Sequence, residues 1–413
     1  MNTDNSKSPI LSKNVSSSNG LEPLLRFPEF TDKLSNVKLS SLFKKCTQKN
    51  KDGQVTNVIC NSAKNGLVPQ RDFFDKDIAN AENTASYYII QKQDFVYNPR
   101  KSNEAPYGPI SMYKYEEDGI VSPLYLCFRL TEPLCANFFE TYFKSCAWHR
   151  YIYLMGDSGA RHDRVSIKDE VFFDMPINIP ALPEQEKIAE FLSLVDERIE
   201  QQRQLVEALK RYKRGLFSLL FNNKTTNYVL SDLIKFGKAG GTPDSGNPYF
   251  YNGNIPFLSI ADMTSQGKYL TKTEKHISDL GVKNSAAWIV PPKSLIISMY
   301  ASYGLVAIND IELTTSQAMF NIITKDSEDI EYLYYYLTYL SFTGYYAKMV
   351  STGTQPNLNA EKIRNIPVYI PNKSEKKFIT DLLSNFERRE NAEDNHLDLL
   401  LNVKSALLQQ MFA

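Results

Sequence analysis

The sequence predicts an α+β protein in which two globular α/β domains are separated by two long helices that pair as an antiparallel coiled coil. The first observation is a tandem repeat: residues 180–221 match residues 371–412 without a gap, at an offset of 371 − 180 = 191. The second is that the same offset recurs earlier in each copy, where Val37–Phe43 matches Tyr228–Ile234 (228 − 37 = 191). One unit, a globular region followed by a long helix, is therefore written twice.

Each long segment carries a coiled-coil seam. In the first copy, alternate steps of four and three residues reach ten positions, and all of them except Gln202 and Lys213 are apolar. The ten are Ile188, Leu192, Val195, Ile199, Gln202, Val206, Leu209, Lys213, Leu216 and Leu220. The same frame continues in the second copy, where Glu390 and Glu393 interrupt it: Ile379, Leu383, Phe386, Glu390, Glu393, Leu397, Leu400, Lys404, Leu407 and Met411. Helices with matched seams most simply pack on each other. We expect residues 181–221 and 372–413 to pair in opposite directions, which relates the two modules by a pseudo-twofold axis.

The two globular regions, residues 21–180 and 222–371, are predicted to mix short strands and helices. In the second region, alternation and apolar stripes predict strands at Ile255–Ile260, Ser294–Tyr300 and Ala318–Ile323 and a helix at Glu328–Leu340. The first region has corresponding pieces at Tyr88–Ile90, Phe95–Tyr97, Leu124–Phe128 and Phe138–Phe143. The ends of the modules share one register, whereas their interiors align only with gaps. Two modules that recognise different targets on one scaffold would show this pattern.

Composition favours a globular protein of two to three domains. The chain has 413 residues, 42% of them hydrophobic, with 47 acidic and 47 basic side chains. A net charge of zero argues against an indiscriminate nucleic-acid binder, which is usually basic. The five cysteines form no Cys-x-x-Cys pair, so a reducing cytosol fits best. We expect residues 1–20 to be a disordered tail, and no segment reads as a signal peptide or membrane span.

Motifs for catalysis are few. The sequence contains no phosphate-binding glycine-rich loop. Asn247–Phe250 is similar to the Asn-Pro-Pro-aromatic motif of amino-methyltransferases, but it lacks the second proline, and a turn is the better interpretation. Glu375–Lys377 carries a nuclease-like Glu-x-Lys that is better explained as helix-start charge. The four histidines lie far apart. We expect no catalytic site, cofactor or metal in this chain.

Polar and aromatic loops are the candidates for contacts with bases and phosphates. Hydroxyl and amide side chains pair with base edges, and an arginine can bind guanine O6 and N7 in bidentate fashion. The candidates in the second region are Lys238, Thr242, Tyr249, Tyr251, Tyr300, Ser302, Tyr303, Ser316, Gln317, Thr354, Gln355 and Asn357. Those in the first region are Arg161, His162 and Arg164. For each single residue, a turn-forming or capping role is the alternative.

Taken in order, several motifs resemble the specificity (S, HsdS) subunits of type I restriction-modification systems. The resemblance covers nearly the whole chain after the tail, and its motifs are Leu25–Phe30, Leu182–Ile188, Gly240–Pro243, Ile255–Ile260 with Asp262, Trp288–Pro292, Thr315–Ala318, Gly353–Asn357 and Lys404–Phe412. Two features depart from the pattern. Lys376 stands where the central copy has Gln185, and the first region lacks the Gly-Gly-Thr-Pro loop.

The resemblance implies a cytoplasmic, non-catalytic subunit with two target-recognition domains, residues 21–180 and 222–371, each reading one half of an asymmetric, interrupted site in double-stranded DNA. It implies two methyltransferase (M) subunits as partners, and restriction (R) subunits where these are present. S-adenosylmethionine, ATP and Mg²⁺ are expected on those partners. Phe191 and Phe217, with their counterparts Leu382 and Leu408, are candidates for docking the partners, and burial against the recognition domains is the alternative.

Two other classes of function stay open on the residues alone. One is a structural coiled-coil adaptor that binds protein through both modules. The other is an enzyme, such as a fused methyltransferase, whose active site is not recognisable in the motifs. Absent or sequence-independent DNA binding would favour the adaptor over a DNA-specificity subunit. Binding of S-adenosylmethionine by this chain alone would favour the enzyme.

Overall fold

Two long helices form close to the predicted bounds. The computed structural model describes residues 22–73, 84–131, 133–156, 163–300, 302–350 and 358–412. Within them, α6 extends over Leu182–Phe221 and α13 over Lys373–Met411. The tail expected at residues 1–20 lies outside the described residues. The chain divides into a first unit, Met1–Gln201 with Leu397–Ala413, and a second unit, Gln202–His396, so each unit contains part of both helices.

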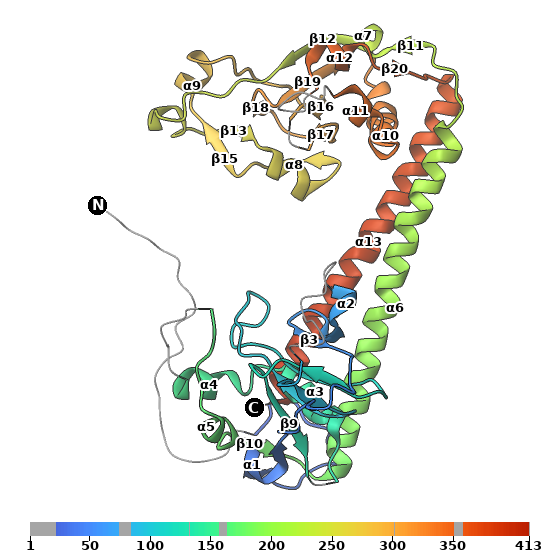
Figure 1. Cartoon of the computed structure of the whole chain (residues 1–413). Coiled ribbons are helices and arrows are strands. Elements are labelled where there is room, and N and C mark those ends of the chain that lie inside the picture. The colour runs from blue at the N-terminus through green and yellow to red at the C-terminus, as the bar shows by residue number, and fades with distance from the viewer. Residues whose placement is uncertain are drawn as a thin grey trace. The chain divides into compact units, whose positions relative to one another are not determined.

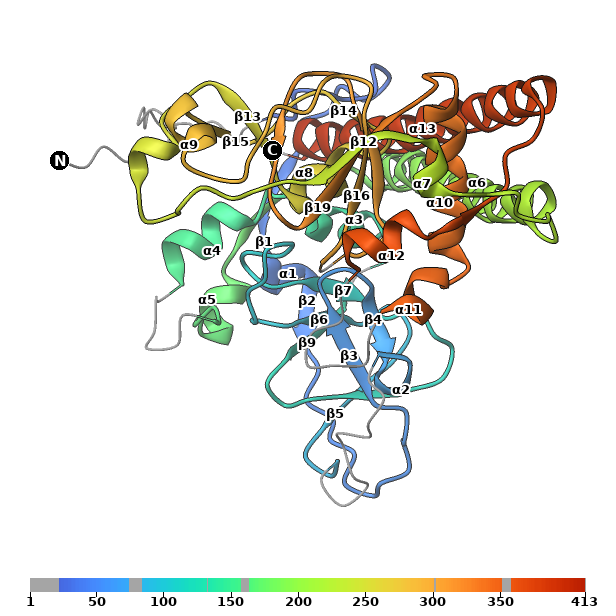
Figure 2. The same cartoon turned by 90° about the horizontal axis from the view of Figure 1, so that it is seen from above.

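Within each unit the two helices run in opposite directions. In the first unit, Lys404 near the end of α13 forms an ion pair with Asp196 in the first half of α6. In the second unit, Lys213 near the end of α6 lies 2.9 Å from Glu390 in the first half of α13. Both views of the chain show the helices side by side (Figure 1, Figure 2). The predicted antiparallel pairing is therefore confirmed in each unit.

The seam is the buried face of both helices. Every one of the ten seam positions predicted on each helix is buried or half-buried. The polar seam positions find partners across it: the Gln202 side-chain amide donates to the carboxylate of Glu393 over 2.8 Å, and these residues are 191 positions apart. The ion pairs are reciprocal as well. Lys213–Glu387 in the second unit repeats Lys404–Asp196 in the first, since 404 − 213 and 387 − 196 both equal 191.

The first unit is built on a four-stranded sheet in the order β2-β9-β6-β7, with two-stranded sheets β1-β10, β3-β4 and β5-β8 beside it. Its strands are β1 Ser35–Lys38, β2 Phe43–Lys45, β3 Ile59–Ser62, β4 Gly66–Pro69, β5 Tyr88–Ile90, β6 Phe95–Tyr97, β7 Ile110–Met112, β8 Gly119–Val121, β9 Leu126–Leu130 and β10 Pro176–Ile179. Its short helices are α1 Leu39–Leu42, α2 Gln70–Phe73, α3 Ala136–Lys144, α4 His149–Met155 and α5 Asp169–Phe173.

The second unit has a five-stranded sheet in the order β12-β19-β16-β17-β14, a three-stranded sheet β15-β13-β18 and the pair β11-β20. Its strands are β11 Tyr228–Val229, β12 Ile234–Ala239, β13 Ile255–Leu258, β14 Tyr269–Leu270, β15 Lys275–Ile277, β16 Leu295–Ser298, β17 Val306–Asn309, β18 Thr314–Thr315, β19 Met319–Thr324 and β20 Pro367–Val368. Its helices are α7 Leu230–Leu233, η2 Pro248–Phe250, α8 Ile260–Gln266, α9 Asp279–Lys283, α10 Asp329–Phe342, α11 Tyr345–Met349 and α12 Ala360–Arg364. The three strands and the helix predicted here are confirmed as β13, β16, β19 and α10.

The repeat is reproduced in the structure as a frame around each sheet. Helix α7 begins and ends 191 residues after α1, and α12 does so relative to α5. The strand pair at the base of each unit also keeps its register, with Val37 opposite Ile177 and Tyr228 opposite Val368. The interiors differ, because the second unit adds β14 and the three-stranded sheet. The predicted contrast between matched ends and diverged interiors is visible in the elements themselves.

Each core is completed by both long helices. In the first unit, Ile188 and Leu192 at the start of α6 pack with Met411 and Phe412 at the end of the chain. In the second unit, Ile379 and Leu383 near the start of α13 lie in one core cluster with Phe217 and Phe221 near the end of α6. Burying one such apolar side chain is worth about 1.5–3 kcal/mol. The first unit therefore completes its core only with a distant segment of the sequence, whereas the second unit draws its parts of both helices from the continuous stretch 202–396.

Lys376 stands where the first copy of the long helix has Gln185, and the structure gives a reason for this difference. The Gln185 side chain accepts the backbone N–H of Cys135, the residue before α3, and donates to the carbonyl of Pro180. Lys376 occupies the equivalent place against α10 and forms an ion pair with Asp329, the first residue of that helix. Both partners are about nine-tenths buried, with side-chain exposures of 11% and 10%. The change from amide to ammonium in the long helix is thus matched by a carboxylate on the helix it contacts.

We predict that Lys376→Gln lowers the free energy of unfolding by about 3 kcal/mol, because it leaves the buried carboxylate of Asp329 without its cation. The double variant K376Q/D329N should recover most of this loss, which a double-mutant cycle on denaturant unfolding would measure. Lys373→Gln is the matched control, since Lys373 pairs with Glu328 at the exposed surface near the same helix start. Equal effects of the two single variants would contradict the prediction.

Candidate nucleic-acid interface

Three turns of the second unit meet at one end of the five-stranded sheet, where strands begin and end. Strand β19 runs antiparallel to both β12 and β16, so the start of β19 lies beside the ends of the other two strands. The turns at residues 240–243 and 316–318 and the described residues 299–300 and 302–304 therefore come together. A backbone hydrogen bond of 2.7 Å from Met299 N to Ala318 O joins two of them. The sheet thus collects polar loops that are far apart in the sequence.

The Gly-Gly-Thr-Pro turn needs its glycines because other backbone lies against it. A Cβ on Gly240 would stand 2.2 Å from the carbonyl oxygen of Thr315, and a Cβ on Gly241 would stand 2.3 Å from the carbonyl carbon of Ala286. Both distances are far below van der Waals contact. The close approach holds the next residue, Thr242, in a fixed and exposed position.

Five of the predicted contact residues form one group around this turn. The Thr242 hydroxyl donates to the side-chain oxygen of Gln317, and both residues are exposed. The Tyr251 hydroxyl donates to the carbonyl of Pro243 over 2.8 Å. Burial and the nearby carboxylate of Asp244 raise the pKa of Tyr251, which keeps its hydroxyl a donor. Lys238 at the exposed end of β12 and half-buried Ser316 complete the group.

The Asn-Pro-Tyr-Phe segment is a capped turn, as the sequence favoured. The side chain of Asn247 accepts the backbone N–H of Tyr249 over 3.1 Å at the start of the short helix η2. The carbonyl of Tyr249 accepts the hydroxyl of Ser278 over 2.8 Å. The Tyr249 side chain itself is 73% exposed. This geometry presents an aromatic ring to solvent beside the turn at residues 240–243.

The remaining predicted residues of this unit differ in exposure. Tyr300 is 39% exposed and Ser302 is exposed, whereas Tyr303 packs partly against the core. Thr354, Gln355 and Asn357 lie outside the described residues. Leu358, the first described residue after them, donates its backbone N–H to the carbonyl of Met299 over 2.9 Å.

The first unit places two arginines opposite each other. Arg164 forms an isolated antiparallel bridge with Arg100, and Lys101 N donates to Asp163 O over 2.9 Å beside it. The other predicted residues here, Arg161 and His162, lie outside the described residues. Sequence reasoning passed over Arg100, although a dibasic Arg-Lys pair after a proline is a visible signal. The bridge borders a hollow of about 420 Å³, whose lining includes Asn61, Asn98 and Ser102 beside apolar side chains.

The four candidates for partner docking are buried to different degrees. Phe217 is 1% exposed and lies in the core of the second unit, which is the burial alternative that the sequence left open. Phe191 is half-buried and packs edge-to-face on Phe27 with 5.7 Å between ring centroids. Leu382 and Leu408 are half-buried, and Leu408 contacts the core of the first unit. A docking role for these residues stays a prediction.

A second apolar stripe on α6 points away from the seam. Leu205, Tyr212 and Leu219 are 37%, 72% and 78% exposed, and the small residues Ala208 and Gly215 lie between them. Their spacing alternates between three and four, as in a helix-packing face. On α13, Leu399 and Val403 are 58% and 44% exposed. They are the counterparts of Ala208 and Tyr212, since 208 + 191 = 399 and 212 + 191 = 403.

Over the described part of the chain, no three or more metal-ligating side chains gather into a possible metal site. In the same part, no helix combines the length and the apolar character that crossing a membrane requires.

The chain belongs to the family described as the type I restriction modification DNA specificity domain, which matches residues 32–211 and again residues 222–399. The fold and the family expected from the motifs are therefore confirmed.

Two curated relatives show what the chain is similar to. It is 34% identical over 146 residues to the type I restriction enzyme HindI specificity subunit of Haemophilus influenzae, covering 35% of this chain and 31% of that protein. It is 29% identical over 149 residues to the MjaIX specificity subunit of Methanocaldococcus jannaschii, covering 36% and 34%. The matches span about a third of these relatives' length.

Solved structures support the fold over nearly the whole chain. A chain from a structure that describes complex assembly and conformational transition of the type I R-M system superposes with a TM-score of 0.62, at 16% identity, covering 93% of this chain and 98% of that one. The S subunit of a type I restriction-modification system from M. genitalium superposes with a TM-score of 0.53, at 15% identity, covering 95% and 99%. At these identities the likeness concerns the fold.

We predict that Gly241→Ala lowers the free energy of unfolding by about 1–3 kcal/mol, because its Cβ has to displace backbone rather than a mobile side chain. Gly246→Ala is the matched control, since a Cβ there meets only the Asp244 carboxylate at 3.4 Å. It should change stability by less than about 0.5 kcal/mol. Denaturant unfolding of both full-length variants is the measurement, and an unchanged G241A would show that the turn is not confined as described.

Proposed function

We propose that this chain is the non-catalytic DNA-sequence-specificity subunit of a type I restriction-modification complex. The observation that carries the proposal is the double family match, which falls once on each repeat of globular region and helix. The contact surfaces agree with it. Exposed hydroxyl, amide and aromatic side chains gather at one end of a sheet in the second unit, and two arginines joined by a backbone bridge border a hollow in the first.

Each recognition domain would read one half of an asymmetric, bipartite DNA site. The support is the contrast between a frame that repeats with an offset of 191 residues and interiors that differ in sheets and loops. Arginines suit guanine edges and phosphates, whereas Thr242, Gln317 and the tyrosines suit mixed hydrogen bonding and stacking. Two domains with different contact chemistry would recognise different sequences. A cytoplasmic location would agree with a DNA substrate of this kind.

The long helices would set the gap between the two half-sites. An α-helix of 40 residues, such as α6, is about 60 Å long at 1.5 Å per residue. One turn of DNA is about 34 Å. A pair of such helices is therefore long enough to keep two contacts more than one turn apart.

Methyl transfer to adenine would belong to two methyltransferase subunits that bind S-adenosylmethionine. Restriction subunits that use ATP and Mg²⁺ would join where they are present. The exposed stripe of Leu205, Tyr212 and Leu219 on α6 supports a docking face, because the alternation of large and small residues fits a partner helix. The comparable exposed residues of α13 support a second, similar face, as two copies of one partner would require.

The central experiment exchanges residues 222–371 for the corresponding region of another specificity subunit and selects DNA from a random duplex pool with the reconstituted methyltransferase complex. We predict that only one half of the selected site changes, because each domain reads its half independently. The unexchanged complex is the control. If both halves changed, or neither, independent readout would be wrong. A complex that enriched no sequence would favour the coiled-coil adaptor instead.

For the docking face, we predict that Tyr212→Ala weakens association with the methyltransferase subunits about tenfold or more, as loss of an exposed aromatic anchor does. Its own unfolding free energy should change by less than about 0.5 kcal/mol. Tyr153→Ala is the matched control, because Tyr153 is 70% exposed but lies on α4. Calorimetric titration of the subunits gives both affinities, and equal affinities of the two variants would remove the stripe as the docking face.

A further inference from the structure

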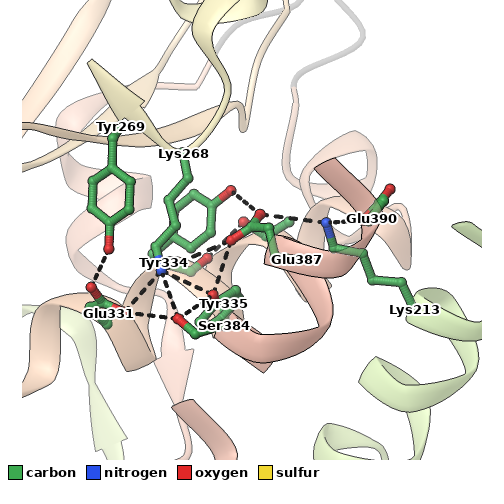
Figure 3. Close-up of polar contacts among 10 residues, drawn as sticks. Lys213, Lys268, Tyr269, Glu331, Tyr334, Tyr335, Ser384, Glu387 and Glu390 are labelled. Atoms are coloured by element: carbon green, nitrogen blue, oxygen red, sulfur yellow. Dashed lines mark hydrogen bonds and ion pairs between the residues drawn. The ribbon is translucent and has the colours of Figure 1, made fainter. Parts of the chain in front are cut away.

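A buried lysine joins the sheet of the second unit to helix α13. Lys268 directly precedes β14, and 5% of its side chain is exposed. Its ammonium donates to Glu331 and to the Tyr335 hydroxyl over 2.9 Å each, and lies 4.0 Å from Glu387 (Figure 3). Glu331 belongs to α10 and Glu387 to α13. One cation therefore connects the sheet edge, a domain helix and a long helix.

Aromatic rings surround this ammonium. The ring centroids of Tyr335, Tyr269 and Tyr334 lie 4.4, 4.9 and 5.3 Å from the Lys268 nitrogen. A desolvated cation is attracted to the faces of such rings, which offsets part of its lost hydration. The three rings and the two carboxylates together enclose the Lys268 ammonium and hold it in one position.

Glu387 is the point where the network reaches both long helices. Its carboxylate accepts the hydroxyls of Tyr335 and Tyr334 over 3.0 and 3.5 Å. It also lies 3.5 Å from Lys213 of α6, which pairs with Glu390 over 2.9 Å. The contacts run without interruption from Lys268 through α13 to α6 (Figure 3).

The carboxylate on α10 is held in its charged form. Burial opposes ionisation of Glu331, but hydrogen bonds from Tyr269 and Lys268 outweigh it, so the pKa of this carboxyl is lowered. The Glu331 carboxylate is therefore ionised at neutral pH.

The network fixes the angle between the globular domain of the second unit and α13 in a way that apolar packing does not. Ile379 and Leu383 of α13 are buried in the core of the unit, and Leu383 lies one helical turn before Glu387. Apolar burial is non-directional, and a small rotation costs little as long as area stays covered. Charged hydrogen bonds are directional, and a rotation that separated Lys268 from Glu331 and Glu387 would leave buried charges unpaired. The polar contacts thus select one orientation among those that the apolar contacts allow.

We propose that Lys268 and Glu387 hold the second recognition domain at one angle on the long helices, and that this angle determines which gap between half-sites the complex accepts. The inference rests on the proposed function. One base pair more in the gap moves a half-site by about 3.4 Å and turns it by about 35° around the DNA axis. Only a firmly attached domain can discriminate against so small a change.

The test measures binding of the reconstituted methyltransferase complex to its selected site and to duplexes whose gap is one base pair shorter or longer. With Lys268→Met we expect the ratio of affinities for the correct and the altered gaps to fall about fivefold. Glu387→Gln, which keeps an acceptor for the tyrosine hydroxyls, should lower the same ratio and serves where the first variant does not fold. Lys268→Arg should restore part of it.

Lys293→Met is the matched control. Lys293 also lies over the ring of Tyr269, at 5.4 Å, but it pairs with Asp310 at the exposed surface rather than with a helix residue. A purely structural role for Lys268 would weaken binding to all gaps equally and leave the ratio unchanged, and that result would overturn the inference. A wild-type complex that binds DNA without any gap preference would instead overturn the spacing part of the proposed function.

Discussion

Everything else in the structure depends on the antiparallel seam between α6 and α13. Each unit takes one helix start and the other helix's end into its own core, so the seam is a condition for both cores rather than a link added between finished domains. The first unit makes this plain, because Met411 and Phe412 at the end of the chain lie in the same cluster as Ile188 and Leu192. The first globular region therefore needs residues 411 and 412, far away in the sequence, to complete its core.

Polar residues in the seam specify how the helices pair. An apolar seam alone would accept neighbouring registers, because its side chains are interchangeable. Gln202 with Glu393, Lys213 with Glu387 and Glu390, and Lys404 with Asp196 can all be satisfied together in one register only. A shift of the helices to another register would leave half-buried charges without partners, which costs more free energy than a misplaced leucine. The reciprocal pairs also explain why the two copies of the helix could diverge elsewhere and still meet.

The two units attach to their helices by partly different chemistry. The first uses the neutral amide of Gln185 and the ion pair of Arg26 with buried Glu184 of α6, and the second uses the buried cations Lys376 and Lys268. Amide contacts leave no charge behind when they break, whereas a buried ion pair leaves an uncompensated carboxylate. Each unit is therefore tied to a long helix by at least one buried charge, a carboxylate of α6 in the first unit and a lysine of α13 in the second.

Local pattern was enough to predict part of this protein. The offset of 191, the seam positions, the bounds of both long helices and several strands follow from periodicity, because period and side-chain polarity act over a few residues. What only the tertiary structure decided involves residues distant in sequence. Phe217 proved buried, Arg100 proved to be the partner of Arg164, and Lys268, one lysine among many in the sequence, proved to be enclosed by three tyrosines and two glutamates. Burial and pairing of this kind depend on which elements the completed sheets and helices bring together, and no local pattern contains that information.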